Sequence, residues 1–255
     1  MNINQPCYLF LDYDGTVANR DTIARETEEA LLRVKREGHF LILCTGRSSG
    51  LLKIARACSV IPWDGYILGG ADLMWKNEWL RRRWISKRDV LRISNYAIRQ
   101  GYSFSLEGHE TCESYKFREI GREVTRELAA QYREKVRAMM EREHVTKISL
   151  HEFEQPMRDV KATILIHPGA FTEYAPAGCG KGEAILAFCR KLKIPLEQCI
   201  GFGDSLNDLS MFETLETCVS MAHAPMRLKE AASYRAKSAY GVAEGIRYYF
   251  GEEEG

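Results

Sequence analysis

The chain has 255 residues, 45% of them hydrophobic and 28% charged, and its formal net charge is +1, which is typical of one large globular domain or two smaller ones. With 36 basic and 35 acidic residues, the chain lacks the excess of positive charge that is typical of proteins that bind nucleic acid or an anionic membrane surface. No run approaches the roughly 20 apolar residues that span a bilayer, and residues 1–6 lack the pattern of a signal peptide. The eight cysteines are scattered without any C-x-x-C pair, so we expect reduced thiols in a cytoplasmic protein.

The first predicted element is a buried strand at residues 7–11, which runs directly into Asp12-Tyr13-Asp14-Gly15-Thr16. An isolated Asp-x-Asp is usually a turn or a solvated pair. Here both carboxylates follow a β-segment, and Gly15-Thr16 supplies a permissive turn. Because two carboxylates this close repel each other, the arrangement needs a cation, a proton or a reaction. We interpret it as a magnesium-assisted phosphoryl-transfer site.

Strands and helices alternate in the rest of the N-terminal part. We expect a helix at residues 27–37 that ends at Gly38, a strand at 39–44, a helix at 48–57 and a strand at 65–68. This β-α-β-α-β order predicts a Rossmann-like parallel sheet with helices on both faces.

The pattern changes in the middle of the chain. A helix that Ser86 can cap, a second long helix and four strand-like runs predict an α+β domain at residues 81–176. The α/β alternation then resumes with a helix at 181–192 and strands at 198–202 and 217–221. We therefore expect an α/β core formed by residues 1–80 and 177–255, with the α+β domain inserted between its two halves.

Four signals occur at predicted strand ends or helix starts: Asp12-x-Asp14, Thr45-Gly46-Arg47, Lys181, and the run Gly203-Asp204-Ser205-Leu206-Asn207-Asp208. Taken singly, a Thr-Gly pair is usually a turn, a lysine at a helix start is usually solvated, and Asp204 could be an ordinary helix cap. Taken together they favour a ligand site, because open α/β sheets bind ligands at the carboxyl ends of their strands.

This ordered set of motifs resembles the haloacid dehalogenase superfamily, and the insertion at residues 81–176 resembles the class IIB cap of its Cof-type hydrolases. The resemblance implies that Asp12 is the nucleophile, which forms an aspartyl-phosphate, and that Asp14 is the general acid and base. It also implies a Mg²⁺ ion held by Asp12, Asp204 and the main-chain carbonyl of Asp14.

The resemblance assigns the remaining motif residues to supporting roles. Thr45, Gly46 and Lys181 would bind the transferring phosphoryl group. Asn207 and Asp208 would orient metal-bound water or Lys181, with Arg47 in a further supporting role.

Two segments depart from the family pattern. Gly69-Gly70-Ala71 stands where members often have Asn-Gly-Ala, and Met221-Ala222-His223-Ala224 stands where they commonly have Met-x-Asn-Ala. Both departures concern loops near the active site, so they bear on substrate contacts. We interpret His223 as a loop residue rather than a catalytic one.

These observations predict a Mg²⁺-dependent phosphatase for small phosphorylated metabolites, with sugar phosphates first. One alternative is a hexose phosphomutase on the same core, which would need a second phosphate site in the inserted domain. Arginines clustered toward Asp12 would favour this alternative. Arg81-Arg82-Arg83, Arg118 and Arg122 could contact a substrate phosphate or sugar acid from the inserted domain, although a charge run is usually a solvated face. A second alternative is a non-catalytic regulator that binds a phosphometabolite. Loss of Asp12, Asp14 or Lys181 would mark it, and all three are present.

Overall fold

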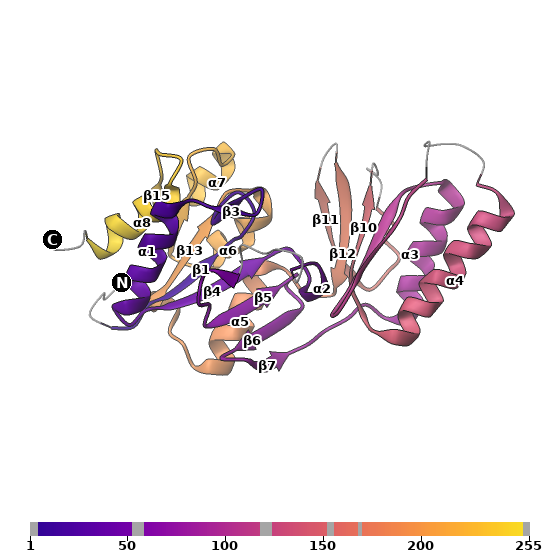
Figure 1. The fold of residues 1–255 in the computed structure, drawn as a ribbon, viewed down its shortest axis with the longest axis horizontal. Helices are drawn as coiled ribbons and strands as arrows, with labels where there is room; N and C mark the ends of the chain where they lie inside the picture. The colour runs from indigo at the N-terminus through magenta and orange to yellow at the C-terminus, as the bar shows by residue number, and fades with distance from the viewer. Residues whose placement is uncertain (1–4, 53–58, 118–123, 152–155, 168–169, 252–255) are drawn as a thin grey trace. The chain divides into compact units, whose positions relative to one another are not determined.

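A computed structural model describes residues 5–52, 59–117, 124–151, 156–167 and 170–251 (Figure 1). The described residues within 1–46, 55–81 and 180–255 form one compact unit, and those within 47–54 and 82–179 form a second. The inserted domain had been predicted at 81–176. The structure adds residues 47–52 to this second unit, because the short helix α2 (Ser49–Leu52) packs against its sheet.

The first unit is built on an eight-stranded sheet. Its strands, in spatial order, are β15 (Tyr234–Arg235), β14 (Thr217–Ser220), β13 (Cys199–Gly203), β1 (Tyr8–Leu11), β4 (Phe40–Thr45), β5 (Gly65–Leu68), β6 (Asp72–Trp75) and β7 (Glu78–Arg81). The pairs from β15 to β5 are parallel, whereas β6 and β7 are antiparallel additions at one edge. The other elements of this unit are β2 (Ala18–Asn19), β3 (Thr22–Ile23), α1 (Arg25–Arg36), α5 (Lys181–Leu192), η2 (Leu196–Gln198), η3 (Leu206–Asp208), α6 (Leu209–Thr214), α7 (Met226–Ala231) and α8 (Gly241–Phe250).

Alternate side chains of the central strand β1 enter two different hydrophobic cores. Leu9 and Leu11 pack with residues of α1 and α8, while Phe10 packs with Phe188 of α5 and with residues of α6. Because successive strand residues point to opposite faces, a strand with helices on both sides must be apolar throughout. The predicted Rossmann-like core with helices on both faces is therefore confirmed.

The β6–β7 hairpin was not predicted. Its two-residue turn, Lys76-Asn77, has positive φ at both positions (45° and 67°), the geometry that suits the twist of a tight hairpin. Gly69 and Gly70 also have positive φ (55° and 64°), and they turn the chain from β5 into the antiparallel β6. The departure from Asn-Gly-Ala at these glycines therefore lies in this turn.

The second unit is an antiparallel five-stranded sheet with two helices on one face. Its strands, in spatial order, are β11 (Ala162–His167), β12 (Phe171–Pro176), β10 (Val145–His151), β8 (Phe104–Gly108) and β9 (Cys112–Tyr115), and its long helices are α3 (Lys87–Gln100) and α4 (Arg126–Arg142). Ser86 caps α3 by accepting a hydrogen bond from the Asp89 amide, as predicted, and Gly101 ends the helix with φ of 69°. The predicted α+β insertion is thus present, with β12 as a strand that was not predicted.

The opposite face of this small sheet carries a row of buried charged side chains. The Lys147 ammonium donates to Glu173 (Nζ–Oε1 2.7 Å) and is paired with Glu107 (3.2 Å). His167 Nε2 lies 3.3 Å from the second oxygen of Glu173. Burial alone would raise the pKa of Glu173, but the His167 hydrogen bond and the Lys147 charge outweigh it and lower the pKa from 4.5 to about 2.

Glu173→Gln should therefore make the free energy of unfolding less dependent on pH in the acid range. A carboxylate with a depressed folded pKa stabilises the fold above its unfolded pKa, and this contribution is lost as the pH falls from about 4.5 to about 2. At neutral pH, the free energy of unfolding of Glu173→Gln should therefore be lower than that of the wild type by an amount on the order of 3 kcal/mol. Urea titrations of both proteins across this pH range measure the difference. The control Asp159→Asn removes an exposed partner of Arg92 and should change the pH dependence of stability far less. The same pH dependence in Glu173→Gln and in the wild type would contradict the prediction.

Candidate active site

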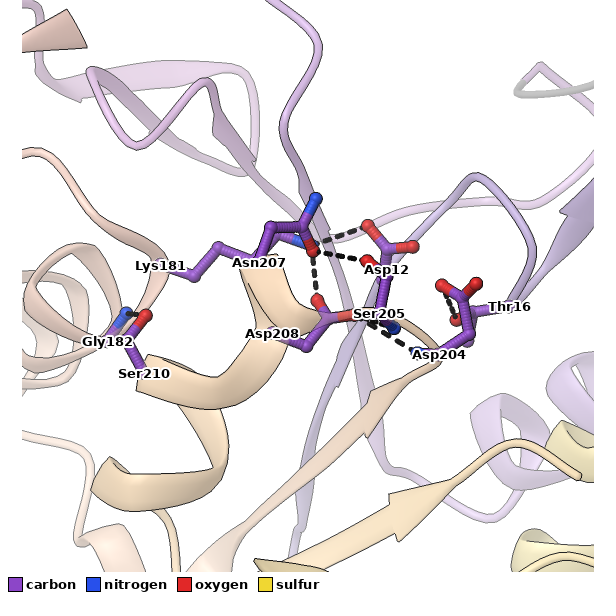
Figure 2. A network of polar contacts seen from close by, with 9 residues as sticks. All are labelled: Asp12, Thr16, Lys181, Gly182, Asp204, Ser205, Asn207, Asp208 and Ser210. Carbon is purple, nitrogen blue, oxygen red and sulfur yellow. Dashed lines mark hydrogen bonds and ion pairs between the residues drawn. The ribbon is translucent and has the colours of Figure 1, made fainter. Parts of the chain in front are cut away.

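The Lys181 side chain joins two of the predicted motifs. It is the first residue of α5, and its ammonium donates to Asp12 Oδ1 and to Asp208 Oδ1, both at 2.5 Å (Figure 2). All three side chains are at least 95% buried. Burial lowers the pKa of Lys181, but the charges of Asp12 and Asp208 outweigh it and raise the pKa above its usual value. Lys181 is therefore a buried cation that neutralises part of a carboxylate cluster.

Asp208 holds the loop that carries the fourth motif. Its Oδ2 accepts hydrogen bonds from the backbone amides of Asp204 (3.0 Å) and Ser205 (3.1 Å), while its Oδ1 accepts from Lys181. A Cβ atom at Gly203 would lie 2.6 Å from Asp208 Cγ, so glycine is required immediately before this loop. Asp208 thus contacts both the Lys181 ammonium and the backbone of the loop at Asp204 and Ser205.

Asp204 is held by residues from two other segments. Thr16 Oγ1 donates to Asp204 Oδ1 at 3.2 Å, and His223 Nε2 lies 3.2 Å from Asp204 Oδ2. Gly15, with φ of 82°, passes so close that an added Cβ would lie 2.4 Å from Asp204 Oδ2. Burial and the charge of Asp208 raise the pKa of Asp204. The first motif therefore contributes Gly15 and Thr16 to the surroundings of Asp204.

The carboxylates of Asp12, Asp204 and Asp208 form one group, with an oxygen of each within 4.8 Å of the others. Burial raises the pKa of Asp12 well above its usual value; Lys181 opposes this shift, and Asp208 and Asp204 add to it. Three carboxylates and one ammonium leave two negative charges without a compensating cation in this group. Because oxygen ligands with a surplus of negative charge are what Mg²⁺ prefers, these residues fit the predicted ion.

The other predicted residues lie at the same edge of the sheet. Asp14 is exposed and forms an isolated bridge with Ala18, so the chain turns sharply after β1. Its side chain is outside the group of three carboxylates found among the described residues. Thr45 is the buried last residue of β4, and a Cβ on Gly46 would lie 3.8 Å from the Asn207 amide nitrogen. The carboxyl ends of β1, β4 and β13 thus bring the four motifs together.

Arg47 is half-buried and follows Gly46 in the part of the chain that packs with the second unit. Arg81 donates to the Gly70 carbonyl at 2.7 Å, which accounts for one residue of the arginine run. Arg118 and Arg122 lie outside the described residues.

Comparison with known proteins identifies the family. A family model for haloacid dehalogenase-like hydrolases matches residues 9–248. The chain belongs to this family. YkrA of Bacillus subtilis, named as a phosphatase, is 24% identical to this hydrolase over 252 residues, which cover 94% of this chain and 95% of the relative. The predicted superfamily and the assignment as an enzyme are confirmed.

Solved structures show the same fold along almost the whole chain of this hydrolase. BT1666 of Bacteroides thetaiotaomicron, described among phosphatases of the superfamily, superimposes with a TM-score of 0.79 at 19% identity and covers 97% of this chain and 96% of its own. BT4131, described as a subclass IIB sugar phosphatase, has a TM-score of 0.75 at 21% identity, with coverage of 96% and 100%. Among the described residues of this hydrolase, no helix is long and apolar enough to cross a membrane.

Sequence reasoning missed two contacts in the site. Thr16 was treated as part of a turn and His223 as a loop residue, whereas both side chains contact Asp204. The signal for His223 was the departure from Met-x-Asn-Ala in a loop that follows a parallel strand. The signal for Thr16 was a hydroxyl two residues after Asp14, which by itself predicts no partner.

Proposed function

We propose that this hydrolase is a Mg²⁺-dependent phosphatase for small phosphorylated metabolites and that it acts through a phosphorylated Asp12. The observation that carries the proposal is the buried Lys181 ammonium between Asp12 and Asp208, beside a third carboxylate. Phosphoryl transfer depends mainly on positioning and charge neutralisation, and this group supplies fixed carboxylates together with a fixed cation.

In the proposed reaction, Asp12 attacks the phosphorus of the substrate. Lys181 holds Asp12 Oδ1 at 2.5 Å, which leaves Oδ2 to form the new O–P bond as the bond to the leaving alcohol breaks. Asp14 donates its proton to the departing oxygen. It then takes a proton from the water that attacks the phosphoaspartate, and this second step releases phosphate and restores the Asp12 carboxylate.

The remaining motif residues would hold the reacting groups in place. Asp12, Asp204 and the main-chain carbonyl of Asp14 would ligate Mg²⁺, whose positive charge would offset the charges of the phosphoryl group and the carboxylates. Thr45, the Gly46 amide and Lys181 would bind the phosphoryl oxygens.

We assign selection of the leaving alcohol to the second unit, with sugar phosphates as the first class to test. The face of its sheet opposite α3 and α4 carries Glu107, Lys147, Ser149 and Glu173, whose carboxylates, ammonium and hydroxyl are suitable hydrogen-bond partners for a sugar. The structural relative BT4131 is described as a sugar phosphatase, which supports the same class.

A phosphate-release screen tests the proposal. The purified protein is incubated with sugar phosphates, nucleotides and phosphorylated cofactors, with Mg²⁺ or with EDTA, and inorganic phosphate is measured together with the organic product. We expect release from at least one sugar phosphate and its loss in EDTA. An isomerised sugar phosphate without free phosphate would favour the phosphomutase. Tight binding of a phosphometabolite without turnover would favour the regulator.

A further inference from the structure

His223 reaches the carboxylate cluster because of the strand order of the sheet. β13 and β14 are parallel neighbours with Gly203 opposite Ser220, so the residues after each strand lie at the same edge. The Met221 amide donates to the Gly203 carbonyl (3.0 Å), and Lys229 Nζ donates to the Ala222 carbonyl (2.5 Å). These bonds anchor the two residues that precede His223, and His223 Nε2 lies 3.2 Å from Asp204 Oδ2.

The contacts of Asp204 differ from those of the other two carboxylates. Asp12 and Asp208 share the Lys181 ammonium, and Asp208 also accepts two backbone amides. Among the described residues, Asp204 instead takes one side-chain donor on each oxygen, from Thr16 on Oδ1 and His223 on Oδ2. Two donors on opposite oxygens fix the rotation of a carboxylate, which one donor alone would leave free.

We propose that His223 is a positioning residue that orients Asp204 as a ligand for the divalent cation. This inference rests on the proposed function, since it presumes a cation at Asp204. A carboxylate only accepts hydrogen bonds, so His223 must present Nε2–H to Asp204. Hydrogen bonds to metal-binding carboxylates fix their orientation, and loss of such a bond typically weakens metal affinity by about 10- to 100-fold.

The chemistry of the contact identifies the variants that test it. His223→Ala removes the donor, whereas His223→Gln keeps an N–H at a similar reach from the backbone. Because the His223 side chain is 61% exposed, neither change should alter the stability of the metal-free protein. His144→Ala is a matched control, since it removes an exposed imidazole that stacks on Trp84 in the second unit.

Isothermal titration of each metal-free protein with Mg²⁺ provides the main readout, and the Mg²⁺-induced shift in melting temperature provides the second. We expect the Kd to rise at least about tenfold for His223→Ala. His223→Gln should return it to within about threefold of the wild type, and His144→Ala should leave it unchanged.

Two outcomes would overturn the role of His223 alone: wild-type affinity in His223→Ala, or equal weakening in the Ala and Gln variants. In either case the proposed function would still stand if the wild type bound Mg²⁺ and released phosphate. Absence of Mg²⁺ binding by the wild type would overturn both proposals.

Discussion

Asp12→Asn should abolish phosphate release while the protein remains folded. The amide has the shape of the carboxylate but cannot attack phosphorus, so we expect activity to fall by about 10⁴-fold or more. Lys181 keeps its partner Asp208 at 2.5 Å, and one of three crowded carboxylates loses its charge. The melting temperature of the metal-free protein should therefore be equal to or above that of the wild type. Phosphate release and thermal unfolding measure the two effects.

Asp64→Asn is the matched control for this variant. Asp64 is a partly buried aspartate of the same unit, bonded to Lys35 (2.6 Å) and to the Leu41 amide (2.9 Å) near the amino ends of β4 and β5. The motif residues lie at the opposite ends of the strands. Asp64→Asn should lower stability by roughly 1–3 kcal/mol and leave turnover intact. Activity that survives in Asp12→Asn would refute the phosphoaspartate mechanism.

Lys181→Met should have the largest effect on stability. Without the ammonium, the side chains of Asp12 and Asp208 remain 5% and 0% exposed with no neutralising charge. Removal of one partner from a buried ion pair typically costs about 3–5 kcal/mol, so we expect a loss of this size near neutral pH. Activity should also be lost, because the same ammonium is assigned to the phosphoryl group.

The loss of stability in Lys181→Met should become smaller as the pH falls. Lys181 opposes the raised pKa of Asp12, so its removal raises that pKa further. A carboxyl group with a raised folded pKa stabilises the fold at low pH and loses that contribution as the pH rises. The difference in the free energy of unfolding between Lys181→Met and the wild type should therefore decrease as the pH falls from 7 toward about 4, the pKa of an aspartate in the unfolded chain. Urea unfolding across this range measures it.

Lys191→Met provides the control for Lys181→Met, because it removes an exposed lysine from the same helix. It should change the free energy of unfolding by less than about 0.5 kcal/mol at every pH. A difference that increases as the pH falls, or a Lys181→Met protein as stable as the wild type at pH 7, would contradict the account of the buried cluster.

Much of the fold could be predicted from local patterns in the sequence. The central strands β1, β4 and β13 are continuous apolar runs, because helices cover both faces of the sheet. Such runs can be recognised in the sequence without knowledge of the fold. The two antiparallel strands β6 and β7 escaped prediction. Their turns depend on positive φ at Gly69, Gly70, Lys76 and Asn77, and neither lysine nor asparagine requires that conformation by itself.

The sequence by itself determined the α/β core with its insertion and the residue types at the strand ends. These features depend on apolar patterns and turn residues that lie within a few positions of one another in the chain. Only the tertiary structure decided which of these residues touch: Lys181 between Asp12 and Asp208, and Thr16 and His223 on the two oxygens of Asp204. Thr16 and Asp204 are 188 residues apart in the chain. Contacts of this kind depend on strand order and register, because only parallel pairing of β13 with β1 and β14 brings their carboxyl ends to one edge.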